Sequence, residues 1–467
     1  MKHTRILIVI ALLGAAALGL PSLRGATITV TTINDNGSGS LRQALTDAAN
    51  FDMINFSSSL NGQTITLTSG ELVVDKHLTI TGPGANRLTV DANHASRVFN
   101  IASGRRVTIS GLTVTNGSAP LPYVSGGGIY NDHATLTLNN CTISGNAAVP
   151  GNGGGIYNDG YGGSATLTIT NCTINGNSAW PGGGIFNYAG TVTITNSTLS
   201  GNSDNGYNYG GAIVNMGPLT ITTSTFSGNS AAAGGGIYNA ATLAITNSTF
   251  SGNSASSGGG IYNDLGATAT MTNCTFSGNS AGTTYNVIYN GTGGGIWNAQ
   301  TVTMTNCTLS ANSATIHGGG IYNVGVDGFT TTIVNIGSTI LNAGPSGENI
   351  YNDDTYYPAT VTSLGYNLSS DDGGGYLTAT ADRINTDPRL GPLQNNGGPT
   401  STHLPAANSP AIDAGDPTLW TDQRGPGFVR IVNARPDIGA LEVQPIPTPT
   451  PTPPTTPTPT PHGHKGH

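Results

Sequence analysis

Carboxylates are the first candidates for chemistry in this chain, and they are sparse. Asp132 and Asp159 each follow the same six-residue box in consecutive copies of a repeat. If consecutive copies stack as neighbouring strands, the two carboxylates lie about 5 Å apart. Oxygen ligands at that spacing can hold Ca²⁺, whereas the alternative is a pair of solvated turn acids. Both interpretations stay open, and we expect no cofactor other than Ca²⁺.

Residues that could together catalyse the cleavage of a polysaccharide are scarce in this sequence. Elimination on an acidic polysaccharide calls for an Arg or Lys base, and no Arg or Lys occurs between Arg106 and Arg383. Inverting hydrolysis needs two carboxyl groups about 6.5–9.5 Å apart, but the repeats offer lone aspartates. We therefore expect a non-catalytic protein, with a polysaccharide lyase or glycoside hydrolase as the alternative.

Cysteine occurs at one position of the repeat, where other copies have serine. Stacking at about 4.8 Å brings Cys141 beside Cys172 and Cys274 beside Cys307. That spacing lies within the Cα–Cα range of a disulfide, and an exported chain meets oxidising conditions. The four residues are therefore either disulfide candidates or small, inward-facing members of a ladder. A catalytic thiol is not expected, because no histidine recurs near this position.

An aromatic residue recurs at the fifth position of the box Gly-Gly-Gly-Ile-Tyr-Asn. If Ile faces inward, the period of two places the ring outward on the same strand. A stripe of rings forms a platform for sugars or a partner surface, or it stabilises the sheet by cross-strand stacking. The candidate ligand-binding residues, interrupted only by Val214, are Tyr130, Tyr157, Phe186, Tyr238, Tyr262, Trp297 and Tyr322.

Short strands must position these side chains. The aromatic box recurs with its Ile at 129, 156, 185, 213, 237, 261, 296 and 321. Between copies lie a second box, such as Ser-Thr-Phe-Ser-Gly-Asn at 224–229, and alternating segments such as Thr-Val-Thr-Ile-Thr at 191–195. Alternation with period two indicates strands. About three strands per repeat predict one coil of a right-handed parallel β-helix, an all-β solenoid.

Corners and a cap complete this solenoid. Asn tolerates the positive φ of tight corners, and it recurs at 140, 171, 196, 247, 273 and 306, where stacked amides can bond from coil to coil. Ser40 with Gln43 three residues later is a helix capping box. Leu41, Ala44, Leu45 and Ala48 then share one helical face. We expect this short helix to plug the exposed end of the solenoid.

Outward threonines form a regular array in the strand that precedes the second box. A flat threonine lattice is similar to that of ice-binding β-solenoids, and the alternative is the β-propensity of threonine on a solvent-facing strand. The pairs are Thr135/Thr137, Thr168/Thr170, Thr193/Thr195, Thr220/Thr222, Thr270/Thr272 and Thr303/Thr305.

Three segments resemble parts of known bacterial surface proteins. Gly39–Ala44, with the later Ile109–Val114, resembles the CSLREA domain of exported β-helix proteins. The aromatic boxes resemble repeats of polymorphic outer-membrane adhesins. Residues 365–442, with Asp387–Leu393 and Ser409–Gly415, resemble the choice-of-anchor Q region. These resemblances imply export and surface display, and they imply no defined chemistry.

The chain is expected to have five parts. Residues 1–25 form a signal peptide whose apolar run is too short to span a bilayer comfortably. An N-terminal cap with irregular coils follows at 26–117, then regular coils at 118–345 and a C-terminal β region at 346–443. Residues 444–467 form a Pro/Thr-rich disordered stalk. It ends in His462, His464 and His467, which either bind metal or remain solvated.

The net charge of the chain limits the classes of partner that it can bind. With 15 Lys+Arg against 23 Asp+Glu, the net charge is −8, which excludes a typical nucleic-acid partner. No stretch after the signal peptide is apolar enough to cross a membrane. We predict an exported protein at the cell surface or in the extracellular space that adheres to a polysaccharide or a cell-surface partner. Its oligomeric state is open.

Overall fold

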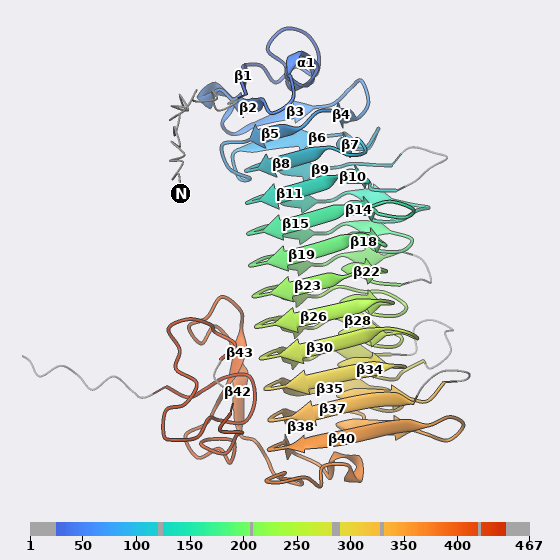
Figure 1. Cartoon of the computed structure of the whole chain (residues 1–467), viewed down its shortest axis with the longest axis vertical. Coiled ribbons are helices and arrows are strands. Elements are labelled where there is room, and N and C mark those ends of the chain that lie inside the picture. Colours follow the sequence, from blue (N-terminus) through green and yellow to red (C-terminus); the bar gives the residue numbers. More distant parts are fainter. Residues whose placement is uncertain are drawn as a thin grey trace, which may run out of the picture.

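The computed structural model describes residues 25–119, 125–205, 209–282, 290–326, 331–418 and 422–444. Three long parallel sheets wind around one interior, and each coil contributes one strand to each sheet (Figure 1). The predicted right-handed parallel β-helix is confirmed. The expected signal peptide and Pro/Thr stalk lie outside the described residues, apart from Gly25 and Gln444. No helix in the described ranges combines the length and the apolar character needed to cross a bilayer.

Sheet A contains the alternating Thr-rich segments. Its strands pair in parallel, coil by coil, so that equivalent residues of successive coils lie side by side. In chain order, sheet A consists of β1 (Thr27–Val30), β2 (Met53–Phe56), β5 (Leu78–Thr81), β8 (Arg106–Ser110), β11 (Thr135–Asn139), β15 (Thr166–Thr170), β19 (Thr191–Thr195), β23 (Leu219–Thr222), β26 (Thr242–Thr246), β30 (Thr268–Thr272), β34 (Thr301–Thr305), β37 (Thr332–Gly337) and β40 (Ala359–Gly365).

Sheet B contains the second box. Its main path is β3 (Gln63–Thr66), β6 (Leu88–Asp91), β9 (Thr113–Thr115), β12 (Thr142–Ser144), β16 (Thr173–Asn175), β20 (Thr198–Ser200), β24 (Thr225–Ser227), β27 (Thr249–Ser251), β31 (Thr275–Ser277) and β35 (Thr308–Ala314), with β38 (Ile340–Ala343) and β41 (Leu368–Ser369) beyond. The short strands β28 (Ser254–Ala255) and β32 (Ser280–Ala281) join at β35, and β13 (Ala147–Ala148), β17 (Ser178–Ala179) and β21 (Ser203–Asp204) form a small separate sheet.

Sheet C contains the aromatic box. Its strands are β4 (Leu72–Val74), β7 (Phe99–Ile101), β10 (Ile129–Asp132), β14 (Ile156–Asp159), β18 (Ile185–Tyr188), β22 (Ile213–Asn215), β25 (Ile237–Asn239), β29 (Ile261–Asn263), β33 (Ile296–Asn298), β36 (Ile321–Val324) and β39 (Ile350–Asp353). The strands of all three sheets continue past residue 345 to Ser369, so coil structure extends into the predicted C-terminal β region.

The interior is built from files of identical residues. Every box Ile from Ile129 to Ile321 is fully buried, because alternate residues of a strand point to opposite faces. On sheet B, Phe226, Phe250 and Phe276 stack inside with ring centroids 4.6 and 4.9 Å apart. Burial of large apolar side chains on every coil supplies the main stabilising force.

Two further files inside the solenoid are polar. The Asn that ends each aromatic box is fully buried from Asn131 to Asn323, and its Nδ2 donates to the Oδ1 of the next coil, for example 2.8 Å from Asn158 to Asn187. The Asn that ends each second box forms an equivalent file from Asn146 to Asn312. Burying an amide costs free energy unless it is hydrogen-bonded. Within each file, the amide of one coil bonds to the amide of the next coil.

The corner asparagines behave as predicted. All six have φ between 47° and 54°. Their amides bond between coils, as in Asn196 Nδ2 to Asn171 Oδ1 at 2.6 Å and Asn273 Nδ2 to Asn247 Oδ1 at 3.1 Å. The corners therefore combine the backbone tolerance of asparagine with a hydrogen bond along the rod.

The predicted N-terminal helix is confirmed as α1 (Leu41–Asp47), at the end of the rod (Figure 1). The Ser40 Oγ accepts from the Gln43 N–H at 3.1 Å, so Ser40 is the N-cap. The Gln43 side chain does not complete the capping box: the Ser40 N–H donates to the Gly37 carbonyl oxygen instead, and Gln43 Nε2 donates to Asp47. Leu41, Ala44, Leu45 and Ala48 are all buried, and they cover the open end of the core.

After β41 the chain leaves the rod and returns along its side (Figure 1). It forms an antiparallel hairpin, β42 (Leu390–Gln394) with β43 (Thr402–Pro405). We call residues 387–418 and 422–444 the C-terminal segment. It lies over the outer face of sheet B, where Thr249 donates to the Ser401 carbonyl oxygen at 2.6 Å and Thr275 to Gln423 Oε1 at 2.6 Å.

Candidate functional site

The predicted aromatic residues form a continuous outer file on sheet C. Ring centroids are 5.4 Å apart for Tyr130–Tyr157, 5.4 Å for Tyr157–Phe186 and 3.9 Å for Tyr262–Trp297, with nearly parallel planes. Because strand register aligns the boxes, each ring lies over the equivalent ring of the next coil. Cross-strand stacking therefore occurs along the file.

Other side chains extend this file at both ends and fill the position where Val214 interrupts it. Arg97 lies over the Tyr130 ring, 5.2 Å from its centroid. Tyr209, from the same coil as Val214, stacks on Tyr238 at 4.4 Å and restores a ring where the box has Val214. Tyr351 extends the file beyond Tyr322. Sequence analysis missed Tyr351 because Glu348 and Asn349 replace two glycines of its box.

Most of the predicted rings are covered. Tyr157, Phe186, Tyr238, Trp297 and Tyr322 are buried, and Tyr130 and Tyr262 are half-buried. Their flat faces contact neighbouring rings, so the faces are not free for a sugar. Ring surface is exposed instead at residues beside the file: Tyr161 (65%), Tyr209 (42%) and Trp180 (41%).

Aspartates accept hydrogen bonds from the tyrosines of the preceding coil. Tyr130 Oη donates to Asp159 Oδ2 at 2.6 Å, and Tyr322 Oη donates to Asp353 Oδ2 at 2.8 Å. Tyr238 donates likewise to Asp264. Burial, followed by the Asp159 hydrogen bond, raises the pKa of Tyr130 well above its usual range. The phenol therefore stays protonated, as a donor must, and the carboxylates of these turns are engaged.

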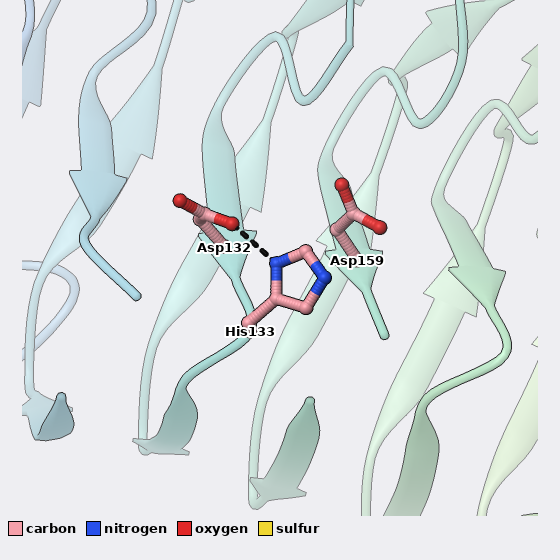
Figure 2. A group of neighbouring side chains, drawn as sticks. All are labelled: Asp132, His133 and Asp159. Carbon is pink, nitrogen blue, oxygen red and sulfur yellow. Dashed lines mark hydrogen bonds and ion pairs between the residues drawn. The ribbon is translucent and has the colours of Figure 1, made fainter. Parts of the chain in front are cut away.

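Asp132 and Asp159, the predicted metal ligands, are brought together with His133 (Figure 2). One ligand atom from each residue lies within 4.8 Å of the others. His133 Nδ1 lies 2.5 Å from Asp132 Oδ1, and Nε2 lies 2.8 Å from the Tyr161 carbonyl oxygen. Both partners are acceptors, so both contacts are hydrogen bonds when the imidazole carries a proton on each nitrogen.

Electrostatics agree with this protonation state. The hydrogen bond to Asp132, followed by that to the Tyr161 carbonyl, raises the pKa of His133. The imidazolium then neutralises charge between the two carboxylates, in the place where a cation would act. These contacts satisfy the cluster without a metal, and Ca²⁺ binding by Asp132 and Asp159 remains a prediction. His133 was missed in the sequence because it does not recur: the equivalent residue of the next coil is Gly160.

The cysteines lie where the repeat predicts. Cys141 and Cys172 are on neighbouring coils, as are Cys274 and Cys307, and all four are buried free thiols. The backbone N–H of Cys141 lies 3.3 Å from Cys172 Sγ. The serines at the equivalent position make the same contact, as in Ser197 N–H to Ser224 Oγ at 3.1 Å. The disulfides therefore remain predictions, while inward packing of a small ladder residue is observed.

Comparison with protein families places this architecture among known repeats. Residues 22–217 match the model for a right handed beta helix region. Residues 223–240 and 247–264 match the Chlamydia polymorphic membrane protein repeat. Both matches cover box-containing coils. No curated protein matches this chain.

Solved structures similar to this chain include polysaccharide lyases. Alginate lyase from Paenibacillus sp. str. FPU-7 is 15% identical, with 73% of this chain and 92% of that chain covered and a TM-score of 0.31. Pectate lyase Pel9A is 16% identical, with 90% and 98% covered and a TM-score of 0.44. The PL6 family alginate lyase AlyGC is 15% identical, with 90% and 60% covered and a TM-score of 0.38. Similarity at this level carries no argument about activity.

Proposed function

We propose that this protein is displayed at a cell surface, where it binds a polysaccharide or a surface partner without transforming it. The observation that carries this proposal is the match of residues 223–240 and 247–264 to the polymorphic membrane protein repeat. We further propose that the protein is exported, which the CSLREA-like and choice-of-anchor Q-like segments support. A rod with long side walls offers the extended surface that such binding uses.

The absence of catalysis is part of the proposal. In the described coils, the sheet C aspartates accept bonds from tyrosines or from His133, and the four thiols are buried. Groups held in this way lack the free acid–base pair that hydrolysis or elimination requires. New reducing ends or unsaturated products formed from a polysaccharide, at a rate that depends on protein concentration, would contradict this part.

Two exposed rings beside the middle coils of sheet C, Tyr161 and Trp180, are the proposed contact residues. Tyr161 stacks on Tyr188 at 4.8 Å, and Trp180 lies in the connection that leads into β18. Exposed aromatic rings bury large apolar area against sugar rings and partner proteins at a low entropic cost. The buried rings of the file support this surface from beneath.

A binding assay tests the assignment. The full chain is assayed for retention on intact cells and on a panel of polysaccharides, together with the double variant Tyr161→Ala/Trp180→Ala. Loss of at least about tenfold in affinity is expected, which corresponds to about 1.4 kcal/mol. The control is Tyr356→Ala, an exposed tyrosine on a turn after β39 (85% exposed). Equal binding by both variants would remove the exposed rings from the site.

A second candidate function rests on the threonine array of sheet A. Register aligns Thr170, Thr195, Thr222, Thr246, Thr272 and Thr305 on six consecutive coils. A neighbouring file is interrupted only by Ala244 between Thr220 and Thr270. The result is a regular lattice of hydroxyl and methyl groups, as in ice-binding solenoids. The purified protein should then show thermal hysteresis, and its absence would eliminate this candidate.

A further inference from the structure

Positive charge in the solenoid is concentrated at one end. The coils carry Lys or Arg only up to Arg106, and no other follows until Arg383. Three of the six Lys and Arg residues between residues 25 and 106 are in ion pairs: Arg42 with Asp35, Lys76 with Asp75, and Arg97 with Glu71. In a chain of net charge −8, the unpaired ones therefore need an explanation.

Arg105 and Arg106 are two of the basic residues that have no acidic partner. Neither guanidinium makes a hydrogen bond or an ion pair within the described ranges, and Arg105 Nε is buried without a partner. Asp75 is the nearby acid, but its carboxylate is held by Lys76 at 3.0 Å. The pKa of Asp75 is accordingly lowered mainly by Lys76, with a smaller contribution from Arg105.

The two arginines line a depression of about 240 Å³ at the corner where sheet C turns into sheet A. Its other walls include His77, His133, Ser164 and Thr166. Arg106, Thr135 and Thr166 are in lateral register on β8, β11 and β15. The depression thus extends across three coils, along the rod.

His77 is oriented for donation in this depression. Its Nδ1 accepts from the backbone N–H of Arg106 at 3.0 Å, so Nε2 carries the proton of the neutral ring. The ring also stacks on Phe51, with centroids 5.1 Å apart. These two contacts fix the imidazole, and two guanidinium groups with one N–H donor then face the same space.

An exposed aromatic residue belongs to the turn that supplies one wall of the depression. Tyr161 and Ser164 belong to the same turn between β14 and β15, and the Tyr161 carbonyl accepts from His133. Tyr161 exposes 65% of its surface. Cationic donors beside an exposed ring match a sugar that carries a negative group, because the guanidinium binds the anion and the ring stacks on the sugar.

We propose that this depression binds the carboxylate or sulfate group of an acidic polysaccharide. Arg105 and Arg106 bind the anion, His77 and Ser164 donate to its oxygens or to sugar hydroxyls, and Tyr161 stacks on an adjoining sugar. The proposal rests on the proposed function, since it names the class of ligand for that surface. A polymer fits better than a free ion because the donors extend over successive coils.

The test uses three polymers with one backbone: carboxymethyl-dextran, dextran sulfate and neutral dextran. The full chain is compared with Arg105→Gln/Arg106→Gln and with Arg87→Gln, an exposed arginine at another corner of the solenoid. Affinity is measured by surface retention at two salt concentrations, and circular dichroism confirms that each variant is folded. The wild type should bind one or both charged polymers at least about tenfold more tightly than dextran.

The double variant should lose about tenfold or more, because a hydrogen bond to a charged group is worth about 1.4 kcal/mol or more. Arg87→Gln should change affinity less than about twofold, since exposed charges act weakly at a distance in salt. Preference for one charged polymer identifies carboxylate or sulfate. Undiminished binding by the double variant, or no binding of charged polymers by the wild type, would overturn the inference. Retention on cells, measured separately, tests the proposed function independently of that result.

Discussion

The outer face of sheet B differs between two halves of the same solenoid. In the first, which we call the open half, Thr142, Thr173 and Thr198 begin their strands half-exposed. In the second, the covered half, Thr249, Thr275 and Thr308 occupy the equivalent position and are buried under the C-terminal segment. The local sequence is nearly the same in both. The environment of a repeat position is therefore set by what docks on it, not by the repeat.

The two halves share their interior. Asn177 in the open half and Asn279 in the covered half make the same bonds: Nδ2 to the next Asn Oδ1 at 3.0 and 2.8 Å, and Nδ2 to a strand carbonyl at 2.9 and 3.0 Å. The difference between the halves is thus confined to the wall, and four experiments can test how far it extends.

The largest effect on stability is expected in the interior, which the two halves share. Asn177→Ala and Asn279→Ala should each lower the free energy of unfolding by roughly 3–5 kcal/mol, because several buried groups lose their partners at about 1–3 kcal/mol each. Urea unfolding measures the loss. Thr198→Ala, on the outer face, is the control and should change stability by less than about 0.5 kcal/mol. Clearly unequal losses for the two asparagine variants would mean that the interiors differ too.

A smaller and local effect is expected at the covered wall. Gln423 is fully buried, and its Nε2 donates to Thr249 Oγ1 at 2.8 Å and to Thr400 Oγ1 at 3.0 Å. Gln423→Ala should cost about 2 kcal/mol, because the buried Thr275 hydroxyl loses its acceptor and the Thr249 and Thr400 hydroxyls each lose a donor.

Amide hydrogen exchange should locate that loss. It should accelerate in β27 and β31 and remain unchanged in β12 and β16. Gln394→Ala, which removes an exposed glutamine of the same C-terminal segment, is the matched control. Faster exchange in both halves would show that the C-terminal segment stabilises the whole rod.

The pH-dependent contributions of the C-terminal segment and of the N-terminal cap should have opposite signs and lie in different pH ranges. Burial raises the pKa of Glu442, in the C-terminal segment, to about 7. A raised carboxyl pKa stabilises the fold at low pH, and this contribution is lost as pH rises through about 7. Burial also favours a higher pKa for Asp35 near α1, but the Thr68 N–H and Arg42 outweigh it and lower the pKa. That contribution is present above the usual aspartate pKa and lost as pH falls below it.

Local hydrogen exchange between pH 5 and 8 should therefore show the C-terminal segment loosening by the order of 1 kcal/mol as pH rises, while the cap around α1 stays constant. Glu442→Gln should flatten the change at the C-terminal segment. A slope that survives in this variant would assign the pH response to another group.

The smallest effect is expected at the cysteine ladder. Cys274→Ser should change stability by less than about 1 kcal/mol, because Ser224 and Ser248 already occupy the equivalent position and bond in the same way, with Ser224 N–H to Ser248 Oγ at 3.1 Å. Cys172→Ser in the open half should behave alike. Mass spectrometry of the unreduced protein should find four free thiols. A mass lower by two hydrogens per pair, with a larger loss on substitution, would instead establish the bridges.

The sequence was sufficient for the architecture because its signals are local. Alternation and the Ser40 cap each depend on residues within a few positions, and the boxes can be recognised by their own six residues wherever they recur; the structure confirms the strands, the coils and the cap. Inward Ile and outward aromatic residues follow from the same period of two.

The candidate site was harder to predict because it depends on distant partners. Burial of the aromatic rings depends on neighbouring coils and on loops such as that of Tyr209. The covered wall joins residues more than a hundred positions apart, as in Thr249 with Ser401. His133, Arg105 and Arg106 lie outside the boxes, so no repeat pattern marks them. Their proximity to one another appears only when the coils are stacked.

One consequence of the asparagine file on sheet C concerns how such a chain evolves. From Asn131 to Asn323 each amide donates forward to the next coil, the last one to Asn352, and within this file only the first acceptor, Asn131 Oδ1, lacks a donor. A duplicated coil inserted anywhere between would receive one hydrogen bond and pass one on, leaving no amide unpaired. Gene duplication can therefore lengthen the rod in steps of about 4.8 Å per coil. Each step increases the distance between the two ends of the rod without changing its cross-section.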